Sequence, residues 1–186
     1  MSLSLLAKEF SRVIDERVGP FDRPLQFRVF PFDAGGALNF LTVGIGRSEP
    51  FVTYVTWDLF GHEQQKRGSF GRYELLATCD DAQWCSDVLT KIGRLGLQEL
   101  FEPGDTLDIG QWVNADAPIQ GVVFEEAFCA ELLGEHCGLL RCIGVTRPEL
   151  EFAMKHGTPA LIERLDRAHV YPHTMIHRKE SIELAT

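Results

Sequence analysis

The stretch that decides the fold is Ile143-Gly144-Val145-Thr146-Arg147-Pro148-Glu149-Leu150, in which a strand runs directly into a helix. The apolar run from Leu139 to Val145 is short and typical of a strand inside a sheet. Thr146 and Glu149 have the spacing of a capping box, in which each side chain accepts a hydrogen bond from the other residue's backbone. Pro148 falls in the first turn, where its missing N–H costs little. The sequence therefore predicts a final strand followed at once by a capped helix.

Helices and runs of strands flank this stretch. Gly157 ends the capped helix, and Thr158-Pro159 starts a second closing helix. An amphipathic helix is predicted over residues 3–18, and a central helix is capped by Asp80 or Asp81. The expected strands cover residues 25–32, 38–45, 51–57, 70–78, 107–112, 119–124 and 139–145.

The order of these elements predicts the fold class. Strands grouped in runs, rather than alternating strictly with helices, indicate an α+β fold with a mixed, largely antiparallel sheet covered by helices. The turn Asp33-Ala34-Gly35-Gly36 predicts a hairpin between the first two strands. We expect a single domain over residues 1–172 and a loose tail over residues 173–186.

Composition and charge argue against several classes of partner. The chain has 186 residues, of which 45% are hydrophobic and 24% charged, as in soluble globular proteins. Its net charge of -9 argues against nucleic acid, because affinity for phosphate backbones needs clustered Lys and Arg. The N-terminus is too charged for a secretory signal, and no apolar stretch approaches the roughly 20 residues that span a bilayer. We therefore expect a cytoplasmic protein without membrane contact.

The cysteines and acidic pairs indicate no catalytic group. Asp80-Asp81 is interpreted as a helix cap and Glu125-Glu126 as a solvated turn. An odd number of irregularly spaced cysteines is typical of free, partly buried thiols in a reducing compartment. The five are Cys79, Cys85, Cys129, Cys137 and Cys142.

The histidines offer two arrangements that resemble sites. His136 adjoins Cys137, but neighbouring residues on a strand point to opposite faces. Three histidines near the C-terminus recur at intervals of four, although Pro172 interrupts the helix that they would need. These are His169, His173 and His177. The sequence therefore predicts no catalytic residue, no cofactor and no metal site.

Several segments, taken in order, resemble the suppressor-of-fused domain family. The resemblance runs from roughly Thr42 to Arg167. Val55 departs from it, since the family favours Gly there, and Trp57 stands where the family favours a small polar residue. The matching segments are Phe51-Val52-Thr53-Tyr54, Gly71-Arg72-Tyr73-Glu74-Leu75-Leu76, Asp81-Ala82-Gln83-Trp84, Pro103-Gly104-Asp105-Thr106, Ile143 to Leu150 and Gly157-Thr158-Pro159-Ala160-Leu161.

The resemblance implies protein binding rather than catalysis. Animal members of this family grip an extended peptide of a transcription factor, and bacterial single-domain members look like immunity proteins that neutralise toxins. We expect a non-enzymatic module that binds a toxin or a regulatory protein. Two alternatives stay open. One is a small cytoplasmic hydrolase or metal-dependent enzyme using His62, Cys137 or the C-terminal histidines, and the other is a binder of a small ligand in an aromatic-lined pocket.

The expected contact surface consists of exposed strand edges and the loop over residues 61–68, because unpaired edges accept extended peptides. Trp57 and Trp112 are candidate anchors, since Trp is over-represented among binding hot spots. A Trp in a strand is more often part of the core. The remaining candidate contact residues are Asp58, His62, Lys66 and Arg67.

Overall fold

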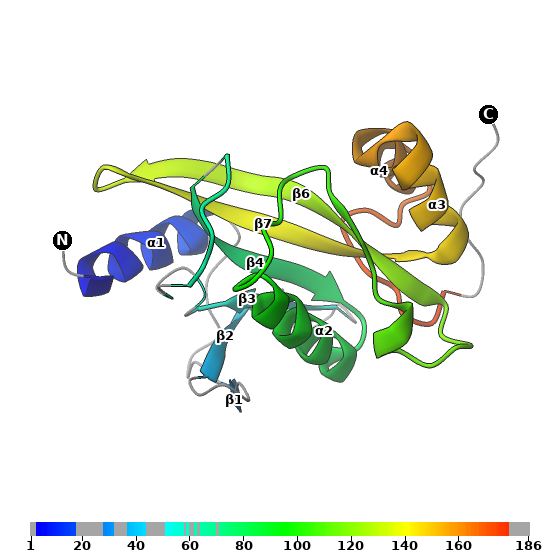
Figure 1. Ribbon diagram of the computed structural model, residues 1–186, viewed down its shortest axis with the longest axis horizontal. Helices are drawn as coiled ribbons and strands as arrows, with labels where there is room; N and C mark the ends of the chain where they lie inside the picture. Colours follow the sequence, from blue (N-terminus) through cyan, green and yellow to red (C-terminus); the bar gives the residue numbers. More distant parts are fainter. Residues whose placement is uncertain are drawn as a thin grey trace.

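The computed structural model describes residues 3–17, 28–31, 37–43, 51–57, 59, 62, 64–69 and 71–178. The strands within these residues form one seven-stranded sheet in the order β1-β2-β3-β4-β7-β6-β5 (Figure 1). The strands are β1 (Arg28–Pro31), β2 (Ala37–Val43), β3 (Val52–Thr56), β4 (Arg72–Cys79), β5 (Thr106–Asp108), β6 (Ile119–Leu132) and β7 (Glu135–Thr146). The helices are α1 (Leu3–Arg17), α2 (Ala82–Leu95), the 3-10 turn η1 (Gly110–Trp112), α3 (Arg147–His156) and α4 (Thr158–Arg167).

The pairing of the strands confirms the predicted α+β class. β4 and β7 pair in parallel, whereas every other pairing between the described strands is antiparallel. The hairpin expected from the turn at residues 33–36 is present, because β1 pairs with β2. The sheet is therefore mixed and largely antiparallel, with helices on both faces.

Helix α2 covers one face of the sheet. Its apolar stripe includes Val88, Leu89 and Ile92, which pack with Leu75 of β4 and Leu140 of β7 in one buried cluster. Asp81 caps the helix as predicted, with its side chain accepting the backbone N–H of Trp84 at 2.7 Å. The cap follows from local sequence, because Asp81 and Trp84 are only three residues apart.

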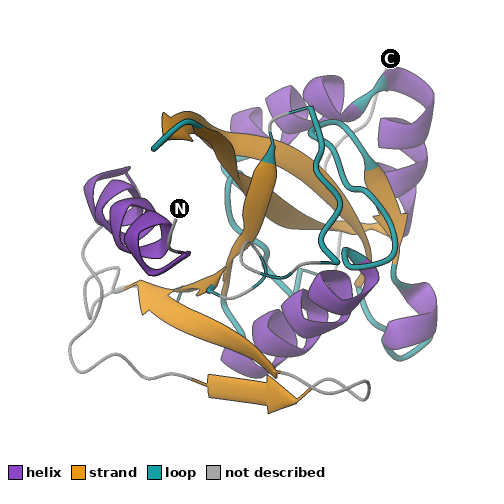
Figure 2. Cartoon of the chain, turned by 60° about the vertical axis from the view of Figure 1, so that its left-hand side comes forward, coloured by secondary structure: helices purple, strands orange, loops and turns teal. Residues whose placement is uncertain are grey.

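The other face is shared between two groups of helices at opposite ends. Alternate side chains of β7 point to this face, so Leu139 packs under α1 whereas Ile143 and Val145 pack under α3 and α4. Figure 1 shows α1 at one end of the long β6–β7 hairpin and the C-terminal helices at the other, and the turned view separates them clearly (Figure 2). Arg141 lies between Leu139 and Ile143 on β7 and therefore points to the same face, between the two helix groups.

The start of α3 lies where residues 143–150 predict it. Thr146 donates its backbone N–H to the Glu149 carboxylate at 2.9 Å, which is the reciprocal bond of the predicted capping box. Gly157 separates α3 from α4, with a φ of 89° that favours glycine. Both closing helices begin where their sequence signals place them, and α3 ends at the predicted Gly157.

The expectation for Glu125-Glu126 is wrong, because these residues lie inside β6 and not in a solvated turn. β6 continues to Leu132 and pairs with β7 over almost its whole length. The expected strand over residues 107–112 is also shorter, since Asp108 accepts the backbone N–H of Gly110 and the chain turns into η1. In both places pairing and side-chain contacts override the local pattern.

The described part of the expected loose tail is held against the sheet. Thr174 is fully buried, and its hydroxyl accepts the N–H of Gly144 at 2.7 Å. Ile176 donates its N–H to Asp80 at 2.8 Å, and Arg178 forms an ion pair with buried Glu149. Residues 173–178 are thus a strap across the ends of β4 and β7, whereas residues 179–186 lie outside the described part of the chain.

Candidate protein-binding surface

The distal half of β6 presents an open strand edge. β5 pairs only with residues 121–123 of β6, and the last backbone bonds on that side join Phe124 to Gly104 and Asp105. Among the described residues, no strand pairs with the outer side of β6 from Glu125 to Leu132, which we call the hairpin edge. Figure 1 shows this part of the β6–β7 hairpin extending toward α1. Unpaired N–H and C=O groups along such an edge accept an extended peptide.

The two faces of the hairpin edge differ in character. Phe128, Ala130 and Leu132 point toward α1 and join its apolar cluster. Glu126 and Glu131 are exposed on strand positions that point the other way. Sequence reasoning missed this edge, although the period-two apolar series from Phe128 to Leu132 is the signal that could have found it.

A β-bulge interrupts the register of the hairpin edge. Glu126 pairs with Leu140 and Phe128 with Leu139, so Ala127 has no partner of its own in β7. Bulges bend a strand and protect its edge from uncontrolled pairing. The hairpin edge is therefore divided into a segment beside the centre of the sheet and a segment beside α1.

The loop predicted as a contact region lies beside the tip of the hairpin. Arg67 is paired with Glu135 at 3.3 Å, and Lys66 is exposed next to it. Gly68 and Gly71 exchange backbone hydrogen bonds, which tie the loop to the start of β4. Lys66 and Arg67 are thus brought to the same end of the molecule as the hairpin edge.

The other predicted contact residues are spread over the molecule. His62 is half-buried, and its carbonyl accepts a bond from Arg72 at 3.2 Å. Trp57 is half-buried against the cluster under α1, whereas Trp112 packs against the cluster under α2, on the opposite face of the sheet. The two Trp side chains therefore do not form one anchor. Asp58 lies outside the described residues.

Trp112 belongs to a shallow pocket of about 300 Å³ on the outer side of α2. Lys91 donates to the Trp112 carbonyl at 3.1 Å, and Arg94 also lines the pocket. This small basic area is separate from the hairpin edge. It combines an aromatic ring with cations, which suits an acidic or aromatic group.

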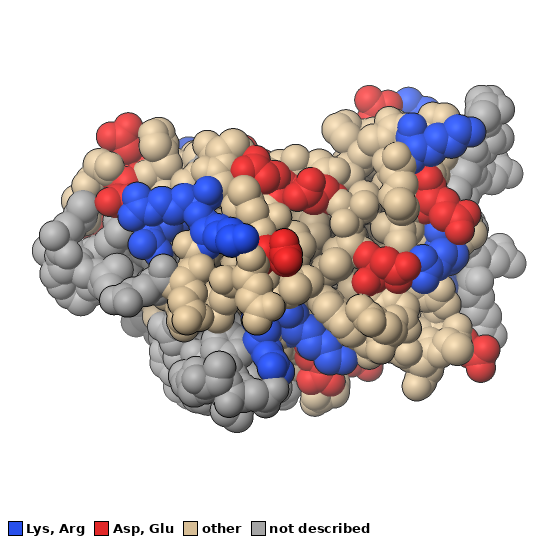
Figure 3. All heavy atoms as spheres, viewed as in Figure 1, with Lys and Arg blue, Asp and Glu red and all other residues tan. Residues whose placement is uncertain are grey.

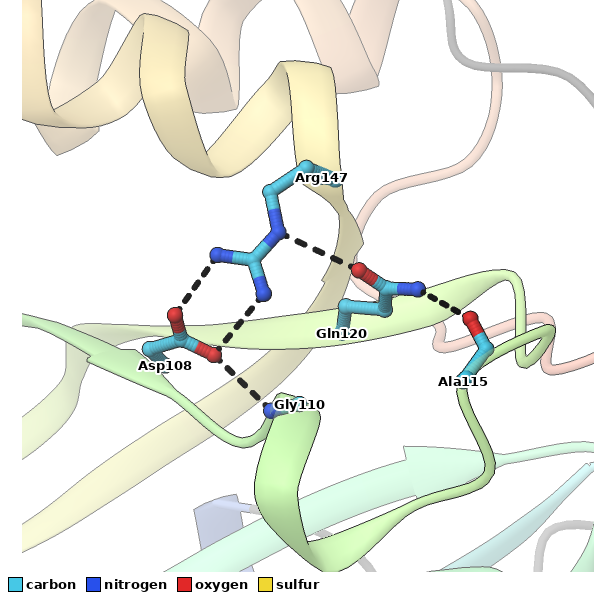
Figure 4. Close-up of polar contacts among 5 residues, drawn as sticks. All are labelled: Asp108, Gly110, Ala115, Gln120 and Arg147. Carbon is cyan, nitrogen blue, oxygen red and sulfur yellow. Dashed lines mark hydrogen bonds and ion pairs between the residues drawn. The ribbon is translucent and has the colours of Figure 1, made fainter.

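A network of polar side chains ties β5 and η1 to the start of α3 (Figure 4). Arg147 makes two bonds to the Asp108 carboxylate, at 2.6 and 3.0 Å, and a third to Gln120 at 3.1 Å. Gln120 in turn donates to the carbonyl of Ala115 at 2.9 Å. The hydrogen bonds from Arg147 hold the pKa of Asp108 below its ordinary value. The network fixes the η1 turn in place.

The thiols are poorly suited to nucleophilic chemistry. All five cysteines are free, and each except Cys129 is buried. Burial raises the pKa of Cys137 to about 11 and also raises the pKa values of Cys85 and Cys142. His136 is exposed on β7 while its neighbour Cys137 is buried, as the alternation of strand side chains predicts. A nucleophilic Cys needs the opposite shift, toward the thiolate.

The C-terminal histidines do not share a helix face. α4 ends at Arg167, and His169 has a φ of 56°. His173 stacks on Phe51 with ring centroids 4.2 Å apart, and His177 is exposed. Within the described residues, no three His, Cys, Asp or Glu side chains gather as a metal site.

Charges of both signs are interspersed on the face shown in Figure 3, where blue and red groups lie side by side. No described helix has the length and apolar character needed to cross a membrane. The hairpin edge is the surface feature that the strand pairing defines most clearly.

Comparisons with known proteins agree with this fold. A chain of the Sufu–Fu complex superposes with a TM-score of 0.69 at 14% identity, covering 96% of this chain and 91% of that one. Drosophila Suppressor of Fused superposes with a TM-score of 0.60 at 14% identity, and the match covers 96% of this chain and 50% of that one. A suppressor of fused homolog from Neisseria gonorrhoeae FA 1090 superposes with a TM-score of 0.63 at 13% identity, and the match covers 96% of this chain and 100% of that one.

No curated protein sequence matches the chain significantly. The model of the Suppressor of fused protein family, in contrast, matches residues 36–179, slightly more than the resemblance predicted from the motifs. Because that match covers most of the chain, the protein belongs to the suppressor of fused protein family.

Proposed function

We propose that this chain is a non-catalytic module that binds another protein, either a toxin that it neutralises or a regulatory protein. The observation that carries the proposal is the hairpin edge, an open strand of a sheet on the fold that Sufu uses in its complex with Fu. The five free thiols are consistent with action in the cytoplasm, where thiols stay reduced.

In this proposal an extended segment of the partner adds to the sheet along the hairpin edge. Backbone hydrogen bonds supply affinity, and alternate side chains supply specificity. Glu126 and Glu131 are exposed along this edge, so a segment that carries Lys or Arg is favoured over an acidic one. Lys66 and Arg67 lie at the hairpin tip and favour acidic groups at one end of that segment.

Trp57 has a different role in the proposal from Trp112. Trp57 packs with the apolar residues beneath the hairpin edge and supports it from behind. Trp112 and the pocket beside Lys91 form a second, independent contact area. Replacement of Trp57 by Ala should therefore reduce stability as well as binding, and replacement of Trp112 should affect stability less.

The test is an affinity pull-down of the tagged full chain from its own cells at moderate salt, with mass spectrometry of the retained proteins. One near-stoichiometric partner is expected, and its identity separates a toxin from a regulatory protein. Reproducible recovery of the chain alone, with the neighbouring genes expressed, would overturn the proposal and favour a small-ligand or enzymatic role.

Charge reversal then locates the surface. The pair Glu126→Lys and Glu131→Lys should release the partner, because it places cations where a basic segment is expected to run. The matched control is Glu151→Lys with Glu163→Lys, which changes the net charge equally at exposed positions of α3 and α4. Equal loss of partner from both double variants would show that net charge, and not the hairpin edge, governs binding.

A further inference from the structure

A pocket lined by polar and apolar side chains lies on the sheet face between α1 and the segment that follows α4. Its volume is about 320 Å³. Its lining includes Arg17 at the end of α1, Arg141 of β7, and His173. Thr53 of β3 and Thr78 of β4 are also part of the lining. The pocket thus lies on strand residues between the two helix groups.

Arg141 is held in place by one of its nitrogens. Its Nη1 donates to Glu125 at 2.7 Å and to the Tyr171 hydroxyl at 2.7 Å, and that hydroxyl also lies 3.0 Å from Glu125. The guanidinium has five N–H donors in a planar fork. Its other two nitrogens have no hydrogen-bond partner among the described residues, so they keep donors for another molecule.

Two buried hydroxyls supply a further donor. The Oγ1 atoms of Thr53 and Thr78 lie 2.8 Å apart and form one hydrogen bond, while both residues are more than nine-tenths buried. Two hydroxyls carry two protons, and this bond uses only one of them. The remaining O–H has no acceptor among the described side chains. A buried donor left without a partner is costly, which makes an acceptor in the pocket favourable.

The charge balance of the lining is positive. Among the described residues of the lining, Arg17 and Arg141 are cationic and none is a carboxylate. Glu125, which lies outside the lining, is already engaged with Arg141 and Tyr171. Guanidinium groups and hydroxyls bind planar or tetrahedral oxygen anions through charge-assisted hydrogen bonds. We propose that this pocket is an oxyanion site that binds one carboxylate or phosphate group between Arg17, Arg141 and the Thr53–Thr78 hydroxyl pair.

The site goes beyond the proposed protein binding, because it is complete within the isolated chain. The oxyanion can come from a free small molecule or from a side chain of a bound partner, and the chemistry recognised is the same. Ala127 and Phe128 of the hairpin edge also line the pocket. An acidic side chain of a segment lying near that edge can therefore reach the pocket.

The experiment is a titration of the full-length, 15N-labelled chain with inorganic phosphate, and separately with acetate, followed by NMR of backbone amides and arginine Nε–H groups. Saturable shifts are expected at Thr53, Thr78 and Arg141, with chloride as the ionic-strength control. Thr78→Val should weaken binding about fivefold, the effect of losing one hydrogen bond. Arg17→Gln should weaken it about threefold, since this cation is exposed.

Arg12→Gln is the matched control for Arg17→Gln, because Arg12 is an exposed cation of the same helix and does not line the pocket. It should leave phosphate affinity unchanged. The proposal is overturned if shifts are diffuse and unsaturable, or if the two arginine variants lower affinity equally. Thr78→Val keeps the test valid should an arginine variant disturb α1.

The source of the oxyanion follows from a second readout with the same variants. If Arg17→Gln releases the protein retained by the wild-type chain, the partner supplies the group. If it lowers phosphate affinity while the partner stays bound, a free anion is the ligand. Both results support the site. The wild-type pull-down tests the protein-binding proposal separately, so the two proposals can fail independently.

Discussion

The buried ion pair between α3 and the C-terminal strap predicts a large and selective loss of stability. Glu149 is fully buried and Arg178 is 10% exposed, and they form two hydrogen bonds, one of them at 2.7 Å. Glu149 also accepts the Thr146 N–H at the start of α3. One carboxylate therefore joins the helix cap to the strap, and its removal disturbs both.

The perturbation is Glu149→Gln, which keeps the shape of the side chain. The amide can still accept one hydrogen bond, but its NH2 group opposes a donor of Arg178 and the buried guanidinium loses its counter-charge. Breaking a buried pair from one side costs about 3–5 kcal/mol. We expect about 3 kcal/mol here, because Arg178 retains slight access to water. The assay is urea denaturation followed by circular dichroism and Trp fluorescence.

The control is Asp108→Asn, which removes the carboxylate of the exposed Arg147–Asp108 pair. Solvent-exposed ion pairs contribute little to stability, so Asp108→Asn should lower the free energy of unfolding by only a small part of the loss in Glu149→Gln. Hydrogen exchange should also rise at the backbone amides of Thr174 and Ile176 in Glu149→Gln alone. A Glu149→Gln chain as stable as Asp108→Asn would refute the reasoning that the buried pair holds the strap.

Three further outcomes follow from particular residues. Gly71→Ala should destabilise the chain more than Gly134→Ala, as measured by urea denaturation. Both glycines have φ near 80°, but a Cβ at Gly71 would lie 2.1 Å from a carbonyl oxygen of β7, whereas a Cβ at Gly134 would meet no atom. Burial raises the pKa of Tyr73 from 10.0 to about 12, so the unfolded chain loses that proton first and stability should fall between about pH 10 and 12; denaturation at several pH values should give a shallower fall for Tyr73→Phe. Titration with a thiol reagent at pH 8 should modify Cys129 in the folded chain and the other four cysteines only after unfolding, and Cys129→Ser should abolish the early reaction.

The sequence patterns that correctly predicted helix starts depend on residues that are close neighbours along the chain. Asp81 caps α2 by accepting the N–H of a residue three positions later, and Glu149 accepts the N–H of Thr146, three positions earlier, at the start of α3. The family resemblance also rests on several such local segments in order, and the match to residues 36–179 confirms it. Short-range hydrogen bonds of this kind are encoded in a few adjacent residues, so they can be read directly.

The hairpin edge was not predicted, because residues 125–132 become a strand only through their pairing with β7, which follows them in the sequence. Glu125 lies in β6 since it pairs with Arg141, both through the ladder and through an ion pair. Two adjacent acidic residues are typical of exposed turns, and nothing local reveals that partner. Likewise, Ile176 reaches Asp80 across 96 positions of sequence, so the strap resembled a loose tail.

The sequence by itself determined the α+β class, the starts of α2 and α3, the hairpin of β1 and β2, and the family. Each of these follows from residue spacing or from short-range bonds. Only the tertiary structure decided which strand edge stays open, where residues 173–178 lie, and how Arg17, Arg141 and the Thr53–Thr78 pair come to share one pocket. Those features arise where strands from distant parts of the chain pair and where two helix groups cover opposite ends of one sheet face, with the pocket between them.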